Sequence, residues 1–558
     1  MTENQDTQNN YLENFKPFFW IMGIGFLLYL PTLFFNFTYL DDNNLILNNQ
    51  YFLSNIANIF PSFLTDVFHL FNSSAFYYRP LLTISFIFDY QINGASPFMY
   101  HFTDIVLHVA SACFLFVLLT KLNYKRALSF LFSIIFLVHP VLTQAIAWIP
   151  GRNDSLLAFF AIPSFIFFLN YLKEKKVGSL IYSLLFFGLA LFTKESAICL
   201  VPVMLFYLIF IYKEEKLSLQ KFYFFFWSLI PLALWAILRH FALSGSPLLS
   251  PIGMVESIFF NSPAVIQLMG KIFFPFNLSV LPIIQDTTFI YGIISIILLA
   301  IMFFFAKNKR WNFILFGFLW FFAFLLPSFI RPNTALVADF IEHRLYVPII
   351  GIFIVLLEMS FIQKIDLKKK TTLFIAGSII ILFSVITIIH SQNFANRLAF
   401  WNNAVQNSPH YPLAHRNLGA MEYLDGNIDT AEKEFKKALE LNPTEQMAHN
   451  NLGLVYAKKG QLQEAENEYK KEIEVNPYYD DVYFNLGLLY WNEKKYEDAK
   501  TNWGKTLSLN PNYVDAYSAL ATYYYSQKDI KNATLYAGAA YQRGATLAPP
   551  LLQLLRNY

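Results

Sequence analysis

The sequence predicts an all-helical protein, in which a polytopic membrane domain of about 11 spans is followed by an α-solenoid. Hydrophobic residues make up 56% of the 558 residues and charged residues only 14%, with a mean hydropathy of +0.41. Soluble domains carry about 25% charged residues, so this composition indicates a membrane protein. The apolar runs end near residue 392, and the remaining chain is polar and repeats every 34 residues. We therefore predict a membrane domain over 1–392 and a repeat region after it.

Apolar runs of membrane-spanning length recur through the first domain. A bilayer core requires roughly 20 apolar helical residues, and we place spans at 18–37, 98–120, 126–142, 154–172, 178–193, 196–212, 221–241, 288–306, 311–330, 345–362 and 371–390. The apolar segment 266–284 is interrupted by Lys271 and by two prolines, so we expect an interfacial or re-entrant segment there. The first run lacks a small-residue cleavage site, so it is expected to remain as a helix.

Basic residues cluster in every second loop. These clusters lie at 121–126, 173–176, 213–221, 307–310 and 364–370, whereas the opposite loops hold scattered cations. Because cytoplasmic loops retain Lys and Arg, we expect the clusters in the cytoplasm. The N-terminus is then cytoplasmic and the repeat region lies on the non-cytoplasmic side. The net charge of +3 and the two cysteines, Cys113 and Cys199, do not identify the compartment.

The last third of the chain has the period of tetratricopeptide repeats (TPRs). Pro409, Pro443, Pro477 and Pro511 recur at 34-residue intervals, and Leu-Gly pairs recur at 418–419, 452–453 and 486–487. We expect a linking half-repeat at 393–411, four repeats over 412–547 and a tail at 548–558. Such arrays bind partners on their concave surface. The predicted groove residues are Arg416, Tyr423, Asn450, Trp491 and Tyr525; the alternative is that the aromatic members pack between repeats.

Ionisable residues collect in the loops assigned to the outer face. Such groups are costly at membrane depth and therefore mark candidate functional sites. They are Asp41, Asp42, Arg79, His101, His108, His139, Arg152, Asp154, Lys194, Glu195, Glu342 and Arg344. Carboxylates and cations on one membrane face suit an anionic, lipid-borne substrate, because Arg and Lys bind phosphate oxygens and a carboxylate can act as a base.

Each of these motifs also has a structural interpretation. The Asp41–Asp42 pair can cap the helix that begins near residue 43, and Arg152 with Asp154 can cap the fourth span. Lys194 and Glu195 can form an ion pair in a tight turn, and Arg344 can snorkel. His101, Asp104 and His108 share one helix face, which suits either structural histidines or a metal site.

Short motifs follow one another along the chain in a fixed order. They are Leu40-Asp-Asp-Asn43, Tyr78-Arg-Pro-Leu81, Pro97-Phe-Met-Tyr-His101 with His108, His139-Pro-Val, Ala147-Trp with Gly151-Arg-Asn-Asp154, Thr193-Lys-Glu195 and Arg344-Leu-Tyr-Val-Pro348. This ordered set, followed by TPRs, resembles the transmembrane and tetratricopeptide-repeat O-mannosyltransferase family and its bacterial relatives. The resemblance covers nearly the whole chain and implies a GT-C glycosyltransferase fold.

The resemblance also implies a chemistry. The family transfers a sugar, mannose in the eukaryotic members, from a polyprenyl-phosphate donor to Ser or Thr hydroxyls with inversion. The resemblance therefore implies that Asp41 or Asp42 is the catalytic base and that the TPR groove binds the acceptor polypeptide. It implies that the donor phosphate is bound by Arg79, Arg152, Lys194 and Arg344. The resemblance does not establish a cofactor, and it is compatible with a divalent metal ion. No nucleic-acid partner is expected. A bacterial inner membrane is favoured over the endoplasmic reticulum.

The chain departs from the family pattern after His139. Relatives carry His and Glu where this chain has Leu142 and Gln144, so a charge is missing there and metal dependence stays open. The main alternative is therefore a non-catalytic, membrane-anchored TPR scaffold for protein assembly. An enzyme that transfers whole glycans and a transporter are further alternatives, although no matched pair of broken helices indicates a transporter.

Overall fold

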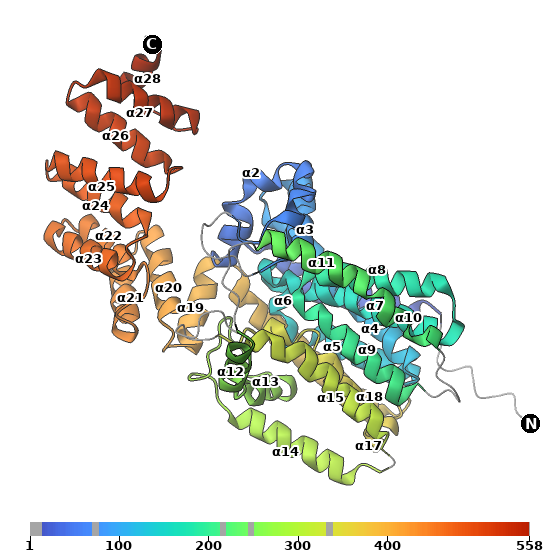
Figure 1. The fold of residues 1–558 in the computed structure, drawn as a ribbon. Coiled ribbons are helices and arrows are strands. Elements are labelled where there is room, and N and C mark those ends of the chain that lie inside the picture. Colours follow the sequence, from blue (N-terminus) through green and yellow to red (C-terminus); the bar gives the residue numbers. More distant parts are fainter. Residues whose placement is uncertain are drawn as a thin grey trace, which may run out of the picture. The chain divides into compact units, whose positions relative to one another are not determined.

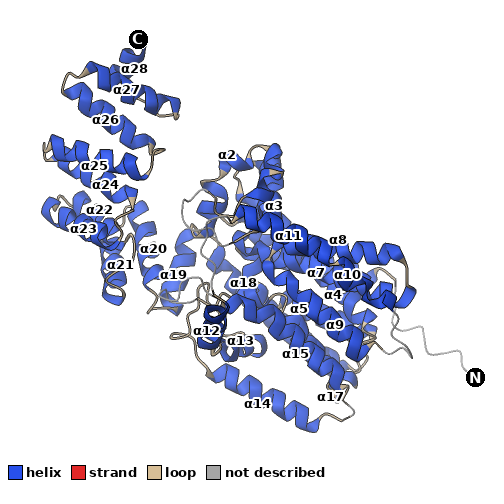
Figure 2. Ribbon diagram, in the orientation of Figure 1, coloured by secondary structure: helices blue, strands red, loops and turns tan. Residues whose placement is uncertain are grey.

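The computed structural model describes residues 14–69, 77–212, 219–243, 250–307, 309–330 and 339–556. Within these ranges the secondary structure is helical, without a β-strand, and Figure 2 shows the helices in blue. This confirms the predicted all-α fold class. The chain divides into two compact units, residues 1–408 and 409–558. Part of the basic cluster predicted at 213–221 lies outside the described residues.

The main helices of the first unit include those that could span a membrane. They are α1 (Lys16–Tyr29), α3 (Pro80–Asn93), α4 (Pro97–Lys121), α5 (Arg126–Val138), α7 (Arg152–Glu174), α8 (Val177–Thr193), α9 (Leu200–Phe206), α11 (Leu229–Ala242), α12 (Pro251–Asn261), α13 (Ala264–Phe273), α14 (Ile290–Phe305), α15 (Trp311–Leu325), α16 (Ile349–Leu357) and α18 (Lys370–Ser391) (Figure 1). Short helices α2 (Gln50–Leu53), α6 (Gln144–Ala147), α10 (Tyr223–Trp227) and α17 (Ser360–Gln363) connect them.

Six stretches of the described chain are long and apolar enough to cross a bilayer. They are 16–34, 97–121, 149–174, 223–242, 311–329 and 370–394, and the count becomes eight if two bent helix pairs each form one span. The bent pairs join α5 to 140–147 at 52° and α12 to α13 at 51°. The predicted count of about 11 spans therefore stays a prediction. In the predicted span 345–362, α16 has only nine residues and is buried among other helices.

Burial separates the central helices from the peripheral ones. The apolar stretch through α7 is 78% buried, whereas the stretch through α18 is 6% buried although it is the most hydrophobic, with a mean hydropathy of 2.6. An exposed face of this composition fits acyl chains rather than water. Close packing in the centre depends on small residues. A Cβ atom on Gly351 of α16 would lie 2.3 Å from the carbonyl oxygen of Gly317 in α15.

Residues 393–411, the predicted linking half-repeat, contain α19 (Arg397–Asn407), which packs within the first unit. The Trp401 indole N–H donates to the carbonyl of Thr38 over 3.1 Å, and the Ser408 hydroxyl donates to the carbonyl of Leu281 over 2.7 Å. Both Trp401 and Ser408 are fully buried. The helix and the residue that follows it thus anchor the segment before Asp42 and the loop after α13.

The second unit is a stack of helix pairs, drawn in orange to red in Figure 1. The pairs are α20 (Pro412–Leu424) with α21 (Ile428–Leu441), α22 (Ala448–Lys458) with α23 (Leu462–Val475), α24 (Asp480–Asn492) with α25 (Tyr496–Leu509), and α26 (Val514–Ser526) with α27 (Ile530–Gln542). Helix α28 (Pro549–Arg556) packs on the last pair. The predicted TPR array is confirmed.

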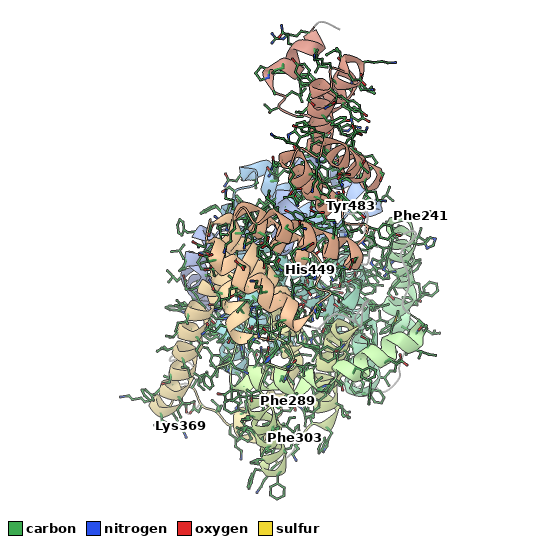
Figure 3. The ribbon with its side chains drawn as sticks, turned by 90° about the vertical axis from the view of Figure 1, so that its left-hand side faces the viewer. Phe241, Phe289, Phe303, Lys369, His449 and Tyr483 are labelled. Atoms are coloured by element: carbon green, nitrogen blue, oxygen red, sulfur yellow. The ribbon has the colours of Figure 1, made fainter. Side chains whose placement is uncertain are left out.

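Each repeat is fastened to the proline that ends the preceding segment. Four residues spaced 34 apart bond to the carbonyl oxygens of Pro409, Pro443, Pro477 and Pro511: His415 at 3.0 Å, His449 at 3.2 Å, Tyr483 at 3.0 Å and Tyr517 at 3.0 Å. Figure 3 labels two of them, His449 and Tyr483. Within the pairs, the recurring glycine gives space to an aromatic ring, since a Cβ on Gly453 would lie 2.6 Å from Tyr469.

Candidate functional site

A cavity of about 580 Å³, lined by both charged and apolar side chains, lies in the first unit. It collects residues from the segment after α1, the start of α3, the start of α7, the turn after α8, the end of α11 and the segment 339–344. Six of the residues predicted from the sequence line it: Asp41, Arg79, Asp154, Lys194, Glu195 and Arg344. Motifs separated by up to 303 positions in the chain therefore meet at one site.

Local sequence explains how these side chains reach the cavity. Pro80 begins α3, because its missing N–H is not needed in the first turn, and this leaves Arg79 at the N-cap with φ −138°. Asp154 lies in the first turn of α7, where the helix dipole favours a carboxylate. Lys194 follows the last residue of α8 in extended conformation, with φ −157°, so its side chain leaves the helix direction.

Cations and carboxylates pair around the cavity. The pairs are Arg79 with Glu195 at 3.5 Å, Lys194 with Asp154 at 2.7 Å, and Arg344 with Asp339 at 3.0 Å. All six side chains are less than 30% exposed. Paired charges tolerate burial, and guanidinium and ammonium groups carry several donors, so a paired cation can also contact an anionic ligand.

Further polar residues that the sequence motifs do not single out also line the cavity, among them Arg239 and His343. Arg239 comes from the last turn of α11, and His343 precedes Arg344. Within the described chain, the Nε atoms of Arg239 and Arg79 are buried and have no hydrogen-bond partner. A buried guanidinium N–H without a partner is costly, which favours an acceptor ligand at this place. The available signal was the position of Arg239 near the outer end of the predicted span 221–241.

His343 is held beside the carboxylate of Asp154. Its Nε2 atom lies 3.5 Å from Asp154 Oδ2, and its ring packs on Trp148 with centroids 5.6 Å apart. Burial lowers the pKa of His343 well below its usual value, and the cations Lys194, Arg344 and Arg79 lower it further. A neutral imidazole is therefore the form present at physiological pH.

Asp41 and Asp42 differ in their surroundings. Asp42 is 1% exposed, and its Oδ2 accepts hydrogen bonds from the backbone N–H of Thr38 at 2.7 Å and from the Thr38 hydroxyl at 2.5 Å. The Trp148 indole N–H donates to the same hydroxyl over 3.1 Å. Asp41 is only half-buried and lines the cavity. Of the two candidate bases, Asp41 therefore has access to a ligand.

Both carboxyl groups are poised to hold a proton near neutral pH. Burial raises the pKa of Asp41 to about 7; the carboxylates of Asp42 and Asp339 raise it further, and Arg79 opposes them. Burial also raises the pKa of Asp42 to about 6, against the hydrogen bonds from Thr38. A general base works best when its pKa lies near the operating pH, and Asp41 meets this condition.

Arg152 lies away from the cavity lining. Its guanidinium is fully buried between Asp104 at 2.5 Å and Asp89 at 2.6 Å, and it also donates to the carbonyl of Tyr100 over 2.7 Å. The ring of Phe86 lies 4.7 Å from the guanidinium carbon. These contacts use the donors that a phosphate would need. The geometry favours a structural role for Arg152 over the predicted phosphate contact.

The three predicted histidines also lie outside the lining. His108 contacts the Tyr346 hydroxyl at 2.6 Å and the Leu137 carbonyl at 2.9 Å, so both ring nitrogens are used. His139 contacts the Ile272 carbonyl at 3.0 Å and accepts from the N–H of Val141. His101 is buried against the ring of Phe35. The contacts of His108 and His139 are those of structural histidines, whereas both ring nitrogens of His101 are buried without a hydrogen-bond partner among the described residues.

Glu342 belongs to a buried network beside the cavity. Its Oε1 lies 2.6 Å from Lys271 Nζ and accepts the N–H of Ser279 at 2.8 Å, while His390 Nε2 lies 3.2 Å from its Oε2. Gln144 joins this network, since its Oε1 accepts the N–H groups of Glu342 at 3.0 Å and of His343 at 3.4 Å. The network fixes the backbone that carries His343 and Arg344.

A metal site is not evident in the part of the chain that the structure describes. No three His, Cys, Asp or Glu side chains there are grouped so that they could hold an ion. Metal dependence stays a prediction that the geometry does not test.

The predicted groove residues of the TPR unit have unequal exposure. Arg416 donates to the Gln446 carbonyl at 3.0 Å and lies 3.4 Å from Glu445. Asn450 is 2% exposed, and Trp491 packs on Tyr496 and Trp503. Tyr423 is half-buried, whereas Tyr525 is 41% exposed. Asn450 and Trp491 are thus occupied by contacts within the array, and ligand contact by the predicted groove residues stays a prediction.

The fold and the cavity define the class: a multi-pass helical membrane protein with a cation-rich polar site and a C-terminal TPR array. Comparison with known families agrees. The family described as dolichyl-phosphate-mannose-protein mannosyltransferase matches residues 82–240, and TPR families match residues 419–460, 448–479 and 480–513. The resemblance that the ordered motifs predict is confirmed by these matches.

Individual relatives are similar over part of their length. Protein O-mannosyl-transferase TMTC1 of Mus musculus is 32% identical over 154 residues, which is 25% of this chain and 16% of that protein. Protein O-mannosyl-transferase TMTC2 of Homo sapiens is 28% identical over 204 residues, which is 35% of this chain and 24% of that protein. The matching segments thus span at most about a quarter of these relatives. The solved structure titled "Crystal structure of MamA" has 22% identity and covers 29% of this chain and 90% of its own, with a TM-score of 0.25.

Proposed function

We propose that this chain is an inverting membrane glycosyltransferase that moves a sugar from a polyprenyl-phosphate donor to Ser or Thr hydroxyls of proteins. The family similarity supports the reaction class, and the cavity supports the chemistry. The observation that carries the proposal is the position of Asp41 in a cavity that also contains Arg79, Lys194, Arg239 and Arg344. A carboxylate base beside several cations suits a reaction that releases a phosphate.

The donor phosphate fits the cationic side of the cavity. Arg79 and Arg239 each have a buried Nε–H without a partner among the described residues. Lys194 and Arg344 add charge at the same site, although each is also paired with a carboxylate. Charge-assisted hydrogen bonds to phosphate oxygens are short and strong, and planar guanidinium groups bind two oxygens at once. These cations are the proposed donor-binding set, with Arg152 left in its structural role.

The chemical step is a single displacement. The acceptor hydroxyl oxygen attacks the anomeric carbon, the bond between that carbon and the phosphate oxygen breaks, and its electron pair stays on the phosphate. The hydroxyl proton passes to the carboxylate of Asp41. Cations placed where negative charge develops stabilise this transition state more than they stabilise the bound donor. Attack opposite to the leaving phosphate inverts the configuration at the sugar.

Asp42 takes a different role in this proposal. It is tied to Thr38, which also receives the Trp148 indole, so it holds the segment that carries Asp41. His343 contacts Asp154 and is neutral, and it keeps the orientation of the carboxylate that pairs with Lys194. Asp42 and His343 are therefore positioning residues.

The TPR array is the proposed holder of the acceptor polypeptide. Holding an acceptor on the same chain raises its effective concentration at the cavity. The charge pattern of the loops supports a non-cytoplasmic position for the array and the cavity, with a cytoplasmic N-terminus. A bacterial inner membrane is the proposed location, and mannose is the first sugar to test.

Transfer by the purified chain tests this proposal. The full-length protein in liposomes is given a polyprenyl-phosphate mannose and an unstructured peptide rich in Ser and Thr, and the product is read by mass spectrometry. We expect one hexose to be added to a hydroxyl residue, and we expect Asp41→Asn to abolish the addition. In cells, loss of the gene should remove hexose from Ser or Thr of exported proteins.

The opposite outcome identifies the alternative function. If the wild-type protein transfers neither mannose nor other polyprenyl-phosphate sugars, and exported proteins keep their hexoses without the gene, the chain is a membrane-anchored scaffold. In that case Asp41→Asn and Asp42→Asn together leave its cellular function unchanged. The two functions are thus separated by one set of variants.

A further inference from the structure

One corner of the cavity is formed by residues at the start of α7. Trp148, Pro150, Asn153 and Asp154 all line the cavity, the first two just before the helix and the other two in its first turn. His343 joins them from a distant part of the sequence and packs on the Trp148 ring, with centroids 5.6 Å apart. We call these five residues the α7 corner.

The side-chain amide of Asn153 is held in one orientation. Its Nδ2 donates to the Pro150 carbonyl over 2.8 Å, which determines the end of the amide at which the oxygen lies. Asn153 is 6% exposed, and its buried Oδ1 has no hydrogen-bond partner among the described residues. The α7 corner therefore contains one buried acceptor without a donor.

The imidazole of His343 supplies a second acceptor of this kind. Its Nε2 lies 3.5 Å from Asp154 Oδ2, and a proton on this nitrogen avoids repulsion between a lone pair and the carboxylate oxygen. Because the ring is neutral, Nδ1 then carries a lone pair and can only accept. His343 is 5% exposed, and Nδ1 is buried without a partner in the part of the chain that the structure describes.

The two acceptors select the chemistry of a ligand. A buried polar atom without a partner is costly, so a ligand that donates hydrogen bonds to both atoms is favoured. Phosphate is not such a ligand, because its ionised oxygens only accept. A cation is disfavoured, because Lys194 bonds to the adjacent Asp154 at 2.7 Å and already places a positive charge there. Neutral hydroxyl groups fit, because each carries an O–H donor.

We propose that Asn153 Oδ1 and His343 Nδ1 accept hydrogen bonds from two hydroxyl groups of the donor's sugar. This inference rests on the proposed function, which supplies a sugar joined to a phosphate. The α7 corner and the proposed phosphate-binding cations line the same cavity, so one donor molecule can contact both. His343 thus orients Asp154 through Nε2 and contacts the sugar through Nδ1.

These contacts make Asn153 and His343 specificity-determining residues. A site that hydrogen-bonds a substrate hydroxyl rejects analogues without that hydroxyl strongly, because its buried polar atoms are then left unpaired. The cations bind any polyprenyl phosphate, whatever group it carries. Discrimination between sugars therefore depends on the α7 corner.

Lipids that differ only in the sugar test the inference. The full-length protein in nanodiscs is titrated with polyprenyl-phosphate mannose, glucose and galactose, and with polyprenyl methyl phosphate. The last lipid is also a phosphodiester with a single negative charge, but it has no sugar. We expect one of the hexose lipids to bind about tenfold more tightly than the methyl ester, as one or two hydrogen bonds imply. Equal affinities for all four lipids overturn the inference.

Two variants remove the acceptors one at a time. Asn153→Ala deletes the first, and His343→Gln deletes the second while its amide can still donate to Asp154. Each variant should bind the preferred hexose lipid about fivefold to tenfold more weakly and the methyl ester as wild type does. An equal loss for both lipids shows a structural role and contradicts the inference, as does an unchanged preference. Two separate positions keep the test usable if one variant folds poorly.

Controls separate the sugar contacts from the phosphate contacts. Asn407→Ala in α19 removes an amide that donates to the Asn403 carbonyl over 3.0 Å, much as Asn153 does at Pro150, but Asn407 does not line the cavity. This control should bind both lipids like wild type. Arg239→Ala should weaken both lipids by the same factor, because both carry the phosphate. If Arg239→Ala removes only the hexose preference, the inference is wrong.

Donors that lack single hydroxyl groups identify the contacts. The preferred hexose lipid is prepared without the hydroxyl at carbon 2, 3, 4 or 6, and each lipid is titrated against wild type and Asn153→Ala. We expect one deoxy lipid to bind wild type about tenfold more weakly, yet to bind Asn153→Ala no more weakly than the complete lipid does. Contacting groups show this lack of additivity, because the variant has already lost the partner. Losses that add in every case contradict the inference.

Failure of this inference can be told apart from failure of the proposed function. Asp41→Asn should keep the preference for the hexose lipid and transfer no sugar. A wild-type chain that prefers a hexose lipid but transfers none retains the sugar site and refutes the transferase. Sugar transfer by a chain that binds all four lipids equally refutes the sugar site alone.

Discussion

Asp42 accepts two hydrogen bonds from Thr38, at 2.7 Å from its backbone nitrogen and 2.5 Å from its hydroxyl, while the adjacent Asp41 lines the cavity. Two neighbouring carboxylates thus have different surroundings. Trp148 donates to the Thr38 hydroxyl, which ties this segment to the start of α7. The division of roles between the two aspartates leads to the first two predictions.

Replacing the two aspartates separately should have unequal effects. Asp41→Asn removes the proposed base and should lower kcat by about 10²–10⁴-fold, the usual contribution of general base catalysis. Asp42→Asn keeps a side chain that can still accept from Thr38, so we expect a smaller loss of kcat and a lower Tm. Transfer rates in liposomes and thermal unfolding in detergent measure both. If Asp42→Asn is the more damaging change for kcat at equal Tm, the base has been assigned to the wrong residue.

The transfer rate should depend on pH through Asp41. Burial raises the pKa of this carboxyl to about 7, and only the deprotonated form accepts a proton. The rate should therefore be half-maximal near pH 7 and level off about one unit above it. Because the charge of Asp42 also raises the pKa of Asp41, Asp42→Asn should move the half-maximal pH downward. A rate that falls as pH rises through this window would contradict a carboxylate base.

Arg239 should be needed for the lipid donor. Arg239 lines the cavity, and its buried Nε–H has no hydrogen-bond partner among the described residues. Hydrogen bonds to charged groups contribute about 1.5–3 kcal/mol, so Arg239→Ala should raise the donor KM by tenfold or more. Arg239→Lys should restore only part of this loss, because an ammonium cannot bind two oxygens in a fork. The matched control is His240→Ala, since the neighbouring His240 is exposed. Donor titrations measure KM, and an unchanged KM in Arg239→Ala removes this residue from the donor site.

Arg152 should act on stability rather than on donor binding. It compensates two buried carboxylates, Asp89 and Asp104, and removing one partner of a buried pair costs about 3–5 kcal/mol. We expect Arg152→Ala to lower the Tm and the yield of folded protein strongly, and Arg79→Ala to raise the donor KM with little change in Tm. Arg152→Ala combined with Asp89→Asn and Asp104→Asn should recover part of the Tm. A stable Arg152→Ala with impaired donor binding would restore the original phosphate assignment.

The repeats and the helical class were accessible from the sequence because they depend on local pattern. Pro409 and its equivalents recur every 34 residues, and each ends a helix for reasons contained in the proline ring. Local pattern also identifies four of the site residues, because they lie at the ends of apolar runs: Asp41, Arg79, Lys194 and Arg344. Charges at run ends must face a polar region, and six of the twelve predicted membrane-domain candidates line one cavity.

Contacts between side chains that lie far apart in the sequence cannot be predicted from the sequence pattern. Arg152 looks like a ligand in its motif, and only the fold brings Asp104, 48 positions away, to its guanidinium. Arg239 lies within an apolar run, and a single arginine in such a run is usually interpreted as extending its charged end to the membrane interface. Asn450 was predicted to face the groove, yet it is covered by the bonds that join Asn451 and Asn485. These roles depend on contacts that form only in the folded structure, and the spacing of the residues in the sequence does not reveal those contacts.

Gln144 is the departure from the family pattern that the structure explains. Its Nε2 donates to the Val280 carbonyl at 3.0 Å, and its Oε1 accepts the N–H groups of Glu342 and His343. The side chain is fully buried, so all of its hydrogen bonds are made within the protein. Such a position requires one donor and one acceptor, which an amide supplies and an ionised carboxylate does not.

Gln144→Glu, which introduces the charge that the family resemblance implies at this position, should therefore destabilise this chain. The carboxylate cannot donate to Val280, and an unsatisfied buried acceptor costs about 1–3 kcal/mol. The charge also lies next to the backbone of Glu342, whose own carboxylate needs Lys271. We expect a lower Tm and a lower transfer rate, with the exposed Gln527→Glu as the control. A Gln144→Glu protein that keeps its Tm and gains metal-dependent transfer would show instead that this position belongs to the reaction, and that the amide limits the wild-type enzyme.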